Sequence, residues 1–267
     1  MPSDPGRTEA TGLGRGFPAD RAALVVYLMA GYPDRATSLE SLRAAARSGA
    51  DVIELGVPYG NPLADGPVIA EAAAVAREAG FGLAESIDLA AEFIAGAGAG
   101  APPVALMTYL NPLMRMGPPR AAAAMREAGI AGVIVPDMPP EAARPWLAAA
   151  SGIDTVFLVA PTSTPGRLAT VGAAASGFVY CVSTTGVTGE RSELPAELDA
   201  LVRKVRARTT LPVAVGFGIS EPAQASAVAR IADGVVVGSA VVRRQEDPDA
   251  VGEFVGWLAA AVRSART

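Results

Sequence analysis

One pattern recurs eight times along the chain: a short run of apolar residues, a turn, and a segment with helical spacing. Each run is too short for an ordinary helix and lacks regular alternation with polar residues, so it is typical of a strand buried on both faces. Eight such units in roughly 240 residues predict a single α/β domain, a (β/α)8 TIM barrel. An open doubly wound sheet also alternates strand and helix, but it rarely needs eight units without a domain break.

The barrel is expected to occupy residues 21–267. Residues 1–20, rich in glycine, proline and charge, are expected to form a flexible tail or a short capping segment. Strands are predicted at 24–29, 52–55, 104–108, 132–135, 155–159, 178–182, 213–215 and 235–237. Helices are predicted at 37–48, capped by Thr37 or Ser38, at 68–79, 83–94, 197–206 and 224–231, and from Glu141 onward.

Composition argues against several classes of function. The 267 residues carry a formal charge of -5 without a basic cluster, so no nucleic-acid-binding surface is expected. No run approaches the ~20 apolar residues of a membrane span. Histidine is absent, which excludes imidazole catalysis and makes a zinc or iron site unexpected. The only cysteine, Cys181, is interpreted as a core residue, and its isolation suits a cytoplasmic setting.

Two carboxylates mark the segment around the second predicted strand. Glu54 lies at the end of an apolar run, where few polar groups offset the cost of a charge. Asp65 lies eleven residues later, after a loop rich in glycine and proline that can fold back over the strand end. Because catalytic loops of a barrel leave the carboxyl ends of its strands, the pair is predicted to act as acid and base. The alternatives are a structural ion pair for Glu54 and a turn cap for Asp65.

Glycine-bearing turns follow the last two predicted strands. Gly216 and Gly218 follow the seventh strand, and Gly238 and Ser239 follow the eighth. Glycines let backbone N–H groups approach an anion, and barrel enzymes often bind phosphate at this position, so a phosphate site is predicted; tight exit turns are the alternative. Residues 183–191 form a long polar loop, interpreted either as a lid over substrate or as a plain surface loop.

Together these segments resemble the tryptophan synthase α subunit family. The resemblance runs from about Leu24 to Arg244. The motifs that carry it are Glu54-Leu-Gly-Val-Pro-Tyr59, Asn61-Pro-Leu-Ala-Asp-Gly-Pro67, Thr185-Gly-Val-Thr-Gly189, Gly216-Phe-Gly-Ile-Ser220 and Gly238-Ser239. The motif that follows the second strand is specific to the family, whereas the glycine turns alone are not.

The resemblance implies a barrel that splits indole-3-glycerol phosphate into indole and glyceraldehyde 3-phosphate by a retro-aldol reaction, without a cofactor. It makes Glu54 the general acid-base residue that protonates indole C3 and handles the glycerol hydroxyl proton. Asp65 would stabilise positive charge at the indole nitrogen, and Tyr180, unless it is only a core aromatic, would orient the glutamate. The resemblance also implies that the indole is contacted by Tyr27, Met107, Phe157 and Leu158, and that Tyr109 is another substrate contact. The implied phosphate-binding residues are Gly189, Gly216, Gly218, Gly238 and Ser239. Thr188, on the lid, would form a hydrogen bond with Asp65.

The chain also departs from the family in the partner-facing segment that contains Pro58, Gly60 and Asn61. The family usually has serine and aspartate where this chain has Gly60 and Asn61, and that aspartate lies beside the β subunit. Asn61 cannot form an ion pair with a basic residue of that partner. A β subunit is still the expected partner, but two alternatives follow: a free-standing indole-3-glycerol-phosphate lyase, or a weakly active barrel that binds and activates a β-type partner.

Overall fold

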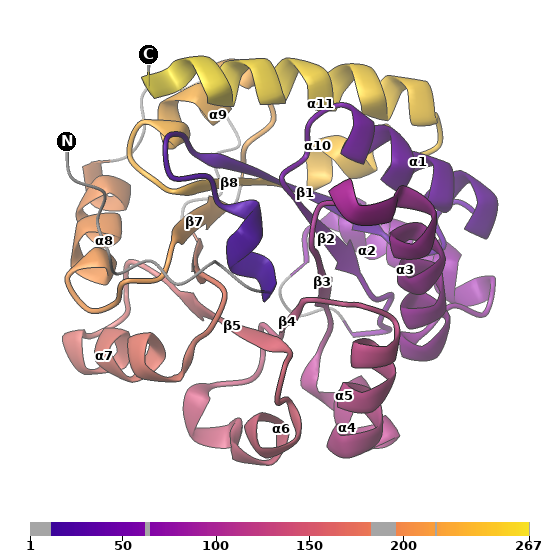
Figure 1. Ribbon diagram of the computed structural model, residues 1–267, viewed down its shortest axis with the longest axis horizontal. Helices are drawn as coiled ribbons and strands as arrows, with labels where there is room; N and C mark the ends of the chain where they lie inside the picture. The colour runs from indigo at the N-terminus through magenta and orange to yellow at the C-terminus, as the bar shows by residue number, and fades with distance from the viewer. Residues whose placement is uncertain (1–11, 62–64, 183–195, 217, 267) are drawn as a thin grey trace.

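The computed structural model describes residues 12–61, 65–182, 196–216 and 218–266, and it contains a closed barrel of eight parallel strands surrounded by helices (Figure 1). Each strand pairs with its neighbours in sequence, and β1 closes the barrel on β8 with Val25 opposite Val236. The strands are β1 (Ala23–Met29), β2 (Val52–Gly56), β3 (Val104–Met107), β4 (Gly132–Ile134), β5 (Asp154–Val159), β6 (Val179–Val182), β7 (Val213–Gly216) and β8 (Gly234–Val237). The predicted TIM-barrel fold is therefore confirmed.

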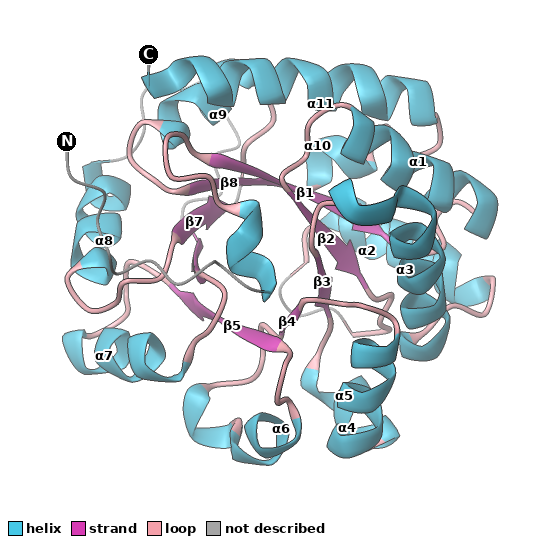
Figure 2. Cartoon of the chain, viewed as in Figure 1, coloured by secondary structure: helices cyan, strands magenta, loops and turns pink. Residues whose placement is uncertain are grey.

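Helices form the outer ring around these strands (Figure 2). No helix among the described ranges is long and apolar enough to cross a membrane. The α-helices are α1 (Arg35–Arg47), α2 (Pro67–Glu78), α3 (Leu83–Ala97), α4 (Leu110–Met116), α5 (Pro118–Glu127), α6 (Arg144–Ala149), α7 (Pro165–Ala174), α8 (Ala196–Arg206), α9 (Pro222–Ala229), α10 (Ser239–Val242) and α11 (Pro248–Arg263). Short 3-10 helices are η1 (Gly12–Gly16), η2 (Gly98–Gly100), η3 (Pro140–Ala142) and η4 (Ser264–Arg266).

Alternation along the strands separates two apolar layers. Residues such as Val25, Val52 and Ala105 face the barrel interior, and their neighbours Val26 and Ile53 pack against the helices. This arrangement follows from the period of two along a strand, which sends successive side chains to opposite faces of a sheet. It explains why the strands read as continuous apolar runs, because both faces of the sheet are covered.

The chain enters the barrel from its amino-terminal end through η1, which crosses the centre of the view in Figure 1. Leu13 and Phe17 are buried in the interior cluster, and the ring of Phe17 lies 5.2 Å from that of Phe178. The backbone N–H of Leu13 donates to Oδ2 of Asp154 at 2.7 Å. Residues 12–17 therefore cover the amino-terminal end of the barrel.

Two local predictions were wrong. Asp34, not Thr37 or Ser38, caps α1: its Oδ1 accepts the backbone N–H of Thr37 at 2.9 Å. Ser38 instead points inward, where its hydroxyl donates to the carbonyl of Met29. The helix expected from Glu141 is only the 3-10 turn η3 followed by the six-residue helix α6, whose first turn contains a proline.

Candidate active site

Glu54 lies on the inner face of β2, opposite Tyr27 of β1, and its side chain points into the barrel near the carboxyl ends of the strands. The residue is only 1 % exposed. Its Oε2 atom has no hydrogen-bond partner among the described residues, and no ion pair there involves it. A structural ion pair therefore does not explain this buried carboxyl group within the described part of the chain.

Burial raises the pKa of Glu54 from 4.5 to about 8, and the negative charge of Asp65 adds to the shift. Desolvation disfavours the ionised form, and no described residue donates a hydrogen bond to Oε2 that would offset this cost. The carboxyl group is consequently protonated at neutral pH. A buried neutral acid beside a reacting group is suited to deliver a proton.

Asp65 lies on the loop between β2 and α2 and is partly buried. Burial raises its pKa, and a hydrogen bond from the Tyr109 hydroxyl opposes that rise. Tyr109 follows β3 and is the residue that precedes α4. Tyr109 donates to Asp65, whereas no described residue donates to Oε2 of Glu54, so the negative charge of Asp65 is the better stabilised of the two.

Tyr27 and Tyr180 flank the two carboxyl groups from β1 and β6. Desolvation raises the pKa of each hydroxyl well above its usual value, and the charges of Glu54 and Asp65 contribute. Both hydroxyls are therefore protonated donors. Tyr180 does not donate to Oε2 of Glu54, because that oxygen accepts no hydrogen bond from any described residue.

Two glycines that sequence reasoning gave no packing role make room for these tyrosines. A side chain at Gly56 would collide with the ring and hydroxyl of Tyr27, and one at Gly216 would collide with those of Tyr180. Each glycine lies two residues beyond an inward-facing position of its strand, so the requirement follows from strand register. Gly216 thus has a steric reason to be glycine that is separate from phosphate binding.

The apolar residues predicted around an indole divide between the two faces of the sheet. Met107 and Leu158 belong to the interior layer and are partly accessible. Phe157, by contrast, is buried in the layer between strands and helices, so its assignment to the indole slot is wrong. Since neighbours in a strand face opposite ways, Phe157 and Leu158 could not both point into the barrel.

The predicted phosphate-binding residues gather at the carboxyl ends of adjacent strands β7 and β8. Gly216 ends β7, Gly218 has a left-handed φ of 75° in the exit turn, and Gly238 precedes Ser239, the first residue of α10. The Gly238 Cα faces Tyr27 and Ile69, since an added Cβ would lie 3.6–3.7 Å from their side chains. Thr188 and Gly189 lie outside the described residues, as does the whole predicted lid.

Sequence reasoning missed a stacked pair beside Asp65. The rings of Tyr59 and Tyr109 lie 5.0 Å apart at an interplanar angle of 29°, and Nδ2 of Asn111 donates to the Tyr59 hydroxyl at 3.2 Å. Tyr59 was visible at the end of the second-strand motif, but no spacing rule connects it to a residue fifty positions later.

Comparison with models of known protein families shows which family this chain belongs to. Residues 17–256 match the family model described as "Tryptophan synthase alpha chain". The chain belongs to the tryptophan synthase alpha chain family. It is therefore an enzyme, a lyase of tryptophan synthesis, and the resemblance found in the sequence is confirmed.

Relatives agree with this membership over most of the chain. The tryptophan synthase alpha chain of Chloroflexus aurantiacus is 47% identical over 230 residues, covering 85% of this chain and 86% of the relative. That of Streptomyces coelicolor is 44% identical over 249 residues, covering 92% and 91%. In the solved Mycobacterium tuberculosis tryptophan synthase, a chain superposes with a TM-score of 0.88 at 42% identity, covering 96% of this chain and 99% of that one.

A structure described as the tryptophan synthase a2b2 complex of the hyperthermophile Pyrococcus furiosus superposes with a TM-score of 0.83 at 36% identity, covering 90% of this alpha-family chain and 99% of that chain. The family thus includes members that assemble with a second type of subunit. In the present chain, three residues were predicted to face the partner. Pro58 is buried, and Gly60 and Asn61 are exposed.

Proposed function

We propose that this chain cleaves indole-3-glycerol phosphate into indole and glyceraldehyde 3-phosphate, as the α subunit of tryptophan synthase. The single observation that carries the proposal is the pair of unequal carboxyl groups: Glu54 is buried with a pKa of about 8, and Asp65 keeps a hydrogen-bond donor. The family comparison supplies the substrate class. Together they support a retro-aldol reaction driven by proton transfer.

In the proposed reaction, neutral Glu54 gives its proton to C3 of the indole ring. The new C–H bond makes the ring an iminium cation, and the bond from C3 to the side chain then becomes the bond that breaks. The carboxylate left on Glu54 takes the proton of the side-chain hydroxyl, whose oxygen becomes the aldehyde of glyceraldehyde 3-phosphate. The bonding pair returns to the ring, and neutral indole leaves.

Asp65 is proposed to face the indole N–H. Protonation at C3 places positive charge on the ring nitrogen, and a fixed carboxylate at that position offsets the charge as it develops. The Tyr109 hydroxyl helps to keep Asp65 ionised, because a donor to a carboxylate favours its charged form. The difference between the two carboxyl groups is thus what the reaction requires.

The same geometry supports proposed contacts for the two ends of the substrate. Met107, Leu158 and Tyr27 would contact the indole from the barrel interior, and the turns after β7 and β8, with Gly218, Gly238 and Ser239, would bind the phosphate through backbone N–H groups. Thr188 and Gly189 stay predictions from the sequence. A cytoplasmic location is part of the proposal, and the single cysteine, which cannot form a disulfide within the chain, is compatible with it.

The free-standing lyase is kept as a second candidate because of one observation. Asn61 is exposed at the position where the family usually presents an aspartate to the β subunit, so the expected ion pair cannot form. Intact Glu54 and Asp65 argue against the third reading, a barrel kept only to activate a partner.

The test is to follow indole release from indole-3-glycerol phosphate by the purified chain, alone and with the β subunit of the same organism. An α subunit is expected to release indole slowly alone and several-fold faster with the partner. Equal, rapid release in both reactions would identify the free-standing lyase. No release in either would overturn both candidates.

A further inference from the structure

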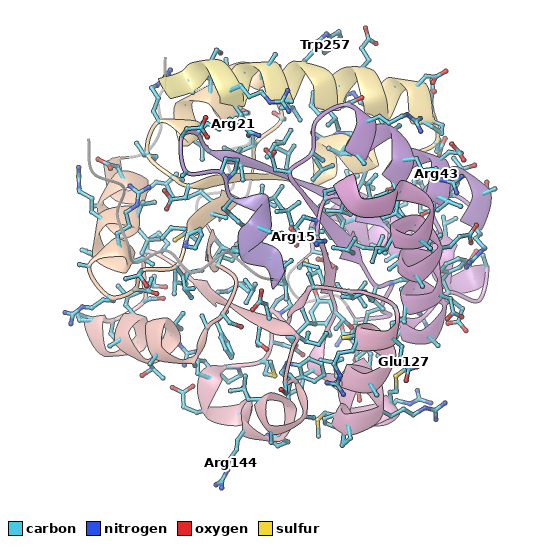
Figure 3. The ribbon with its side chains drawn as sticks, in the orientation of Figure 1. Arg15, Arg21, Arg43, Glu127, Arg144 and Trp257 are labelled. Atoms are coloured by element: carbon cyan, nitrogen blue, oxygen red, sulfur yellow. The ribbon has the colours of Figure 1, made fainter. Side chains whose placement is uncertain are left out.

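A completely buried glutamine, Gln245, follows α10 and belongs neither to the carboxyl pair nor to the predicted phosphate-binding residues. Long polar side chains of this protein can reach solvent, as that of Arg144 does where it points away from the body of the molecule (Figure 3). Burying a side-chain amide costs free energy unless its donors and its acceptor are bonded. The hydrogen bonds of Gln245 must therefore offset that cost.

The side chain of Gln245 bonds the end of β1. Its Oε1 accepts the backbone N–H of Met29 at 2.9 Å, and its Nε2 donates to the carbonyls of Met29 at 2.7 Å and Tyr32 at 2.9 Å. Gln245 and Met29 are 216 positions apart in the sequence. One amide group thus connects the segment after α10 to the exit of the first strand.

The amide of Gln245 lies where β1 extends beyond β8. Pairing between these strands ends at Val26, whereas β1 continues to Met29. In a parallel sheet, the backbone groups of successive residues turn alternately to the two neighbouring strands. The N–H of Ala30 donates to the carbonyl of Gly56 in β2 at 2.9 Å, so Met29 turns its groups to the β8 side. Gln245 there takes the place of a further β8 residue and pairs backbone groups that burial would otherwise leave unsatisfied.

Backbone hydrogen bonds also join Gln245 to the turn of Gly238 and Ser239, the proposed phosphate-binding turn after β8. The carbonyl of Gly238 accepts the N–H groups of Val241 at 2.8 Å and Val242 at 3.1 Å. The carbonyl of Val242 in turn accepts the N–H of Gln245 at 3.1 Å. The turn and the glutamine are therefore the two ends of one hydrogen-bonded segment.

The phosphate-binding turn consequently lies between two attachments to the same strand. Before the turn, β8 pairs with β1 at Val26, and after the turn Gln245 bonds Met29. Tyr27 lies between these attachment points, and Gly238 faces it, since an added Cβ at the glycine would lie 3.6 Å from the Tyr27 side chain. The position of the turn over the barrel interior therefore depends on both attachments.

Neighbouring helices add to the second attachment. The hydroxyl of Ser41, a buried residue of α1, donates to the backbone carbonyl of Gln245 at 3.0 Å. Val242 of α10 belongs to the same buried apolar cluster as Tyr27 and Met29. Polar and apolar contacts thus hold the segment after the turn against the end of β1.

We propose that Gln245 is a positioning residue for the substrate phosphate: its side chain fixes the turn of Gly238 and Ser239 to the end of β1. Because Tyr27 of β1 pairs with Glu54 of β2, this attachment sets the distance between the phosphate and the proposed proton donor. The inference rests on the proposed function, which assigns the phosphate to that turn. Since β2 holds the other edge of β1, loss of the glutamine should release the turn rather than the strand.

The test measures binding of two small probes to the full chain by titration calorimetry. Glycerol 3-phosphate reports on the phosphate end of the site, and indole reports on the barrel interior. Gln245→Met keeps the length of the side chain but removes its three hydrogen bonds, so glycerol 3-phosphate should bind about tenfold more weakly and indole less than about twofold more weakly. The KM for indole-3-glycerol phosphate should rise about tenfold, with kcat changed less than about threefold.

Two further variants test the hydrogen bonds themselves. At pH 6 a buried glutamic acid is neutral, so Gln245→Glu keeps the acceptor and one donor and should bind glycerol 3-phosphate within about threefold of the wild type. Binding as weak as that of Gln245→Met would overturn the proposal. If Gln245→Met does not fold, Ser41→Ala decides, because it removes one bond to the same residue. It should weaken glycerol 3-phosphate binding about threefold, and unchanged affinity would overturn the proposal.

The matched control is Thr155→Val, at the amino-terminal end of β5. Thr155 is buried, and its hydroxyl oxygen accepts the N–H of the Trp146 ring at 3.0 Å. The substitution also removes a buried hydrogen bond, but at the far end of the barrel, so both probes should bind within about twofold of the wild type. Equal weakening of glycerol 3-phosphate by Thr155→Val and Gln245→Met would overturn the proposal, as would equal weakening of both probes by Gln245→Met.

The two probes also separate this proposal from the proposed function. Glycerol 3-phosphate binding that depends on Gln245, in a chain that releases no indole from indole-3-glycerol phosphate, would support the positioning role and overturn the proposed function alone. Indole release by the wild type, with unchanged glycerol 3-phosphate affinity in Gln245→Met, would overturn the positioning role alone.

Discussion

Carboxylates lie at both ends of the barrel, and the two groups differ in what surrounds them. At the amino-terminal end, Asp51, Asp154 and Asp233 stand at or just before the first residues of β2, β5 and β8. Each accepts at least one backbone N–H from a neighbouring segment. At the carboxyl-terminal end, Oε2 of Glu54 is buried and has no partner among the described residues, and Asp65 accepts a hydrogen bond from the Tyr109 hydroxyl.

The amino-terminal carboxylates join the starts of adjacent elements. Asp51 accepts the N–H of Leu24 at 2.8 Å and two bonds of 2.7 Å from the Arg21 guanidinium. Asp233 accepts the backbone N–H of Val213 at 3.0 Å, and this hydrogen bond connects the start of β8 to the start of β7. Such bonds satisfy backbone donors that the ends of a parallel sheet leave open.

The difference shows which carboxyl groups stabilise the folded state and which do not. A carboxylate that accepts backbone and guanidinium donors stabilises the barrel, whereas a buried carboxyl oxygen without a donor costs stability when ionised. Among the described residues, a buried side-chain oxygen without a partner occurs at Glu54, on the face where we propose that the neutral acid acts. We therefore expect opposite effects of mutation at the two ends. Substitutions at the carboxyl-terminal end should lower turnover more than stability, and substitutions at the amino-terminal end should lower stability more than turnover.

The largest expected effect is that of Glu54→Gln. Glutamine keeps the shape of the side chain but cannot donate or accept the catalytic proton, so indole release should fall about 1,000-fold. Single-turnover assays with indole-3-glycerol phosphate would measure it. Glu78→Gln, an exposed residue at the end of α2, is the matched control and should retain wild-type turnover. Near-normal turnover by Glu54→Gln would contradict the assigned role.

The same variant should change how stability depends on pH. The folded protein holds the Glu54 proton up to about pH 8, whereas the unfolded chain releases it near 4.5. Between those values the folded state binds more protons, so stability falls as pH rises, by up to about 1.4 kcal/mol per pH unit from this group. Glu54→Gln should flatten that decline in urea unfolding curves recorded from pH 5 to pH 8. An unchanged slope would mean that Glu54 is ionised in the folded state.

Asp154→Ala tests the other end of the barrel. Its loss leaves the Leu13 N–H without its acceptor and frees η1 from β5, which should cost about 1–3 kcal/mol of unfolding free energy. Turnover at 25 °C should stay at the wild-type level, since Asp154 lies at the opposite end of its strand from the reaction. Asp88→Ala, an exposed aspartate of α3, serves as control and should change stability by less than about 0.5 kcal/mol. Lost turnover with unchanged stability would break the comparison.

How far the sequence could predict this molecule depends on the kind of contact. Strand positions were readable because strands buried on both faces appear as apolar runs, and Glu54 stood out as a charge inside one. The error at Phe157 came from ignoring strand alternation, which allows only Leu158 of that pair to face inward. By contrast, Tyr59 and Tyr109 lie fifty positions apart in the sequence, and their rings stack only in the folded protein. No local sequence pattern predicts such a long-range contact.

The smallest expected effect is that of Tyr109→Phe, which separates the two carboxyl groups of the catalytic face. Phenylalanine keeps the stack on Tyr59 but removes the hydroxyl that lowers the pKa of Asp65. The pKa of Asp65 should therefore rise, and a higher pH is then needed to ionise it. The acidic limb of the kcat/KM profile for indole release should move about one pH unit upward, the size expected for one hydrogen bond to a charged group. Turnover near pH 7.5 should change little.

Tyr32→Phe provides the matched control for that shift. Tyr32 also donates its hydroxyl to a carboxylate, Oε1 of Glu246 at 2.6 Å, but that pair is exposed and lies outside the barrel. Its loss removes the same kind of bond and should leave the acidic limb where it is. If both variants move the limb equally, the shift is not specific to Asp65. If the acidic limb stays in place in Tyr109→Phe, the carboxylate that limits turnover at low pH is not Asp65. That result would contradict the separate roles proposed for Glu54 and Asp65.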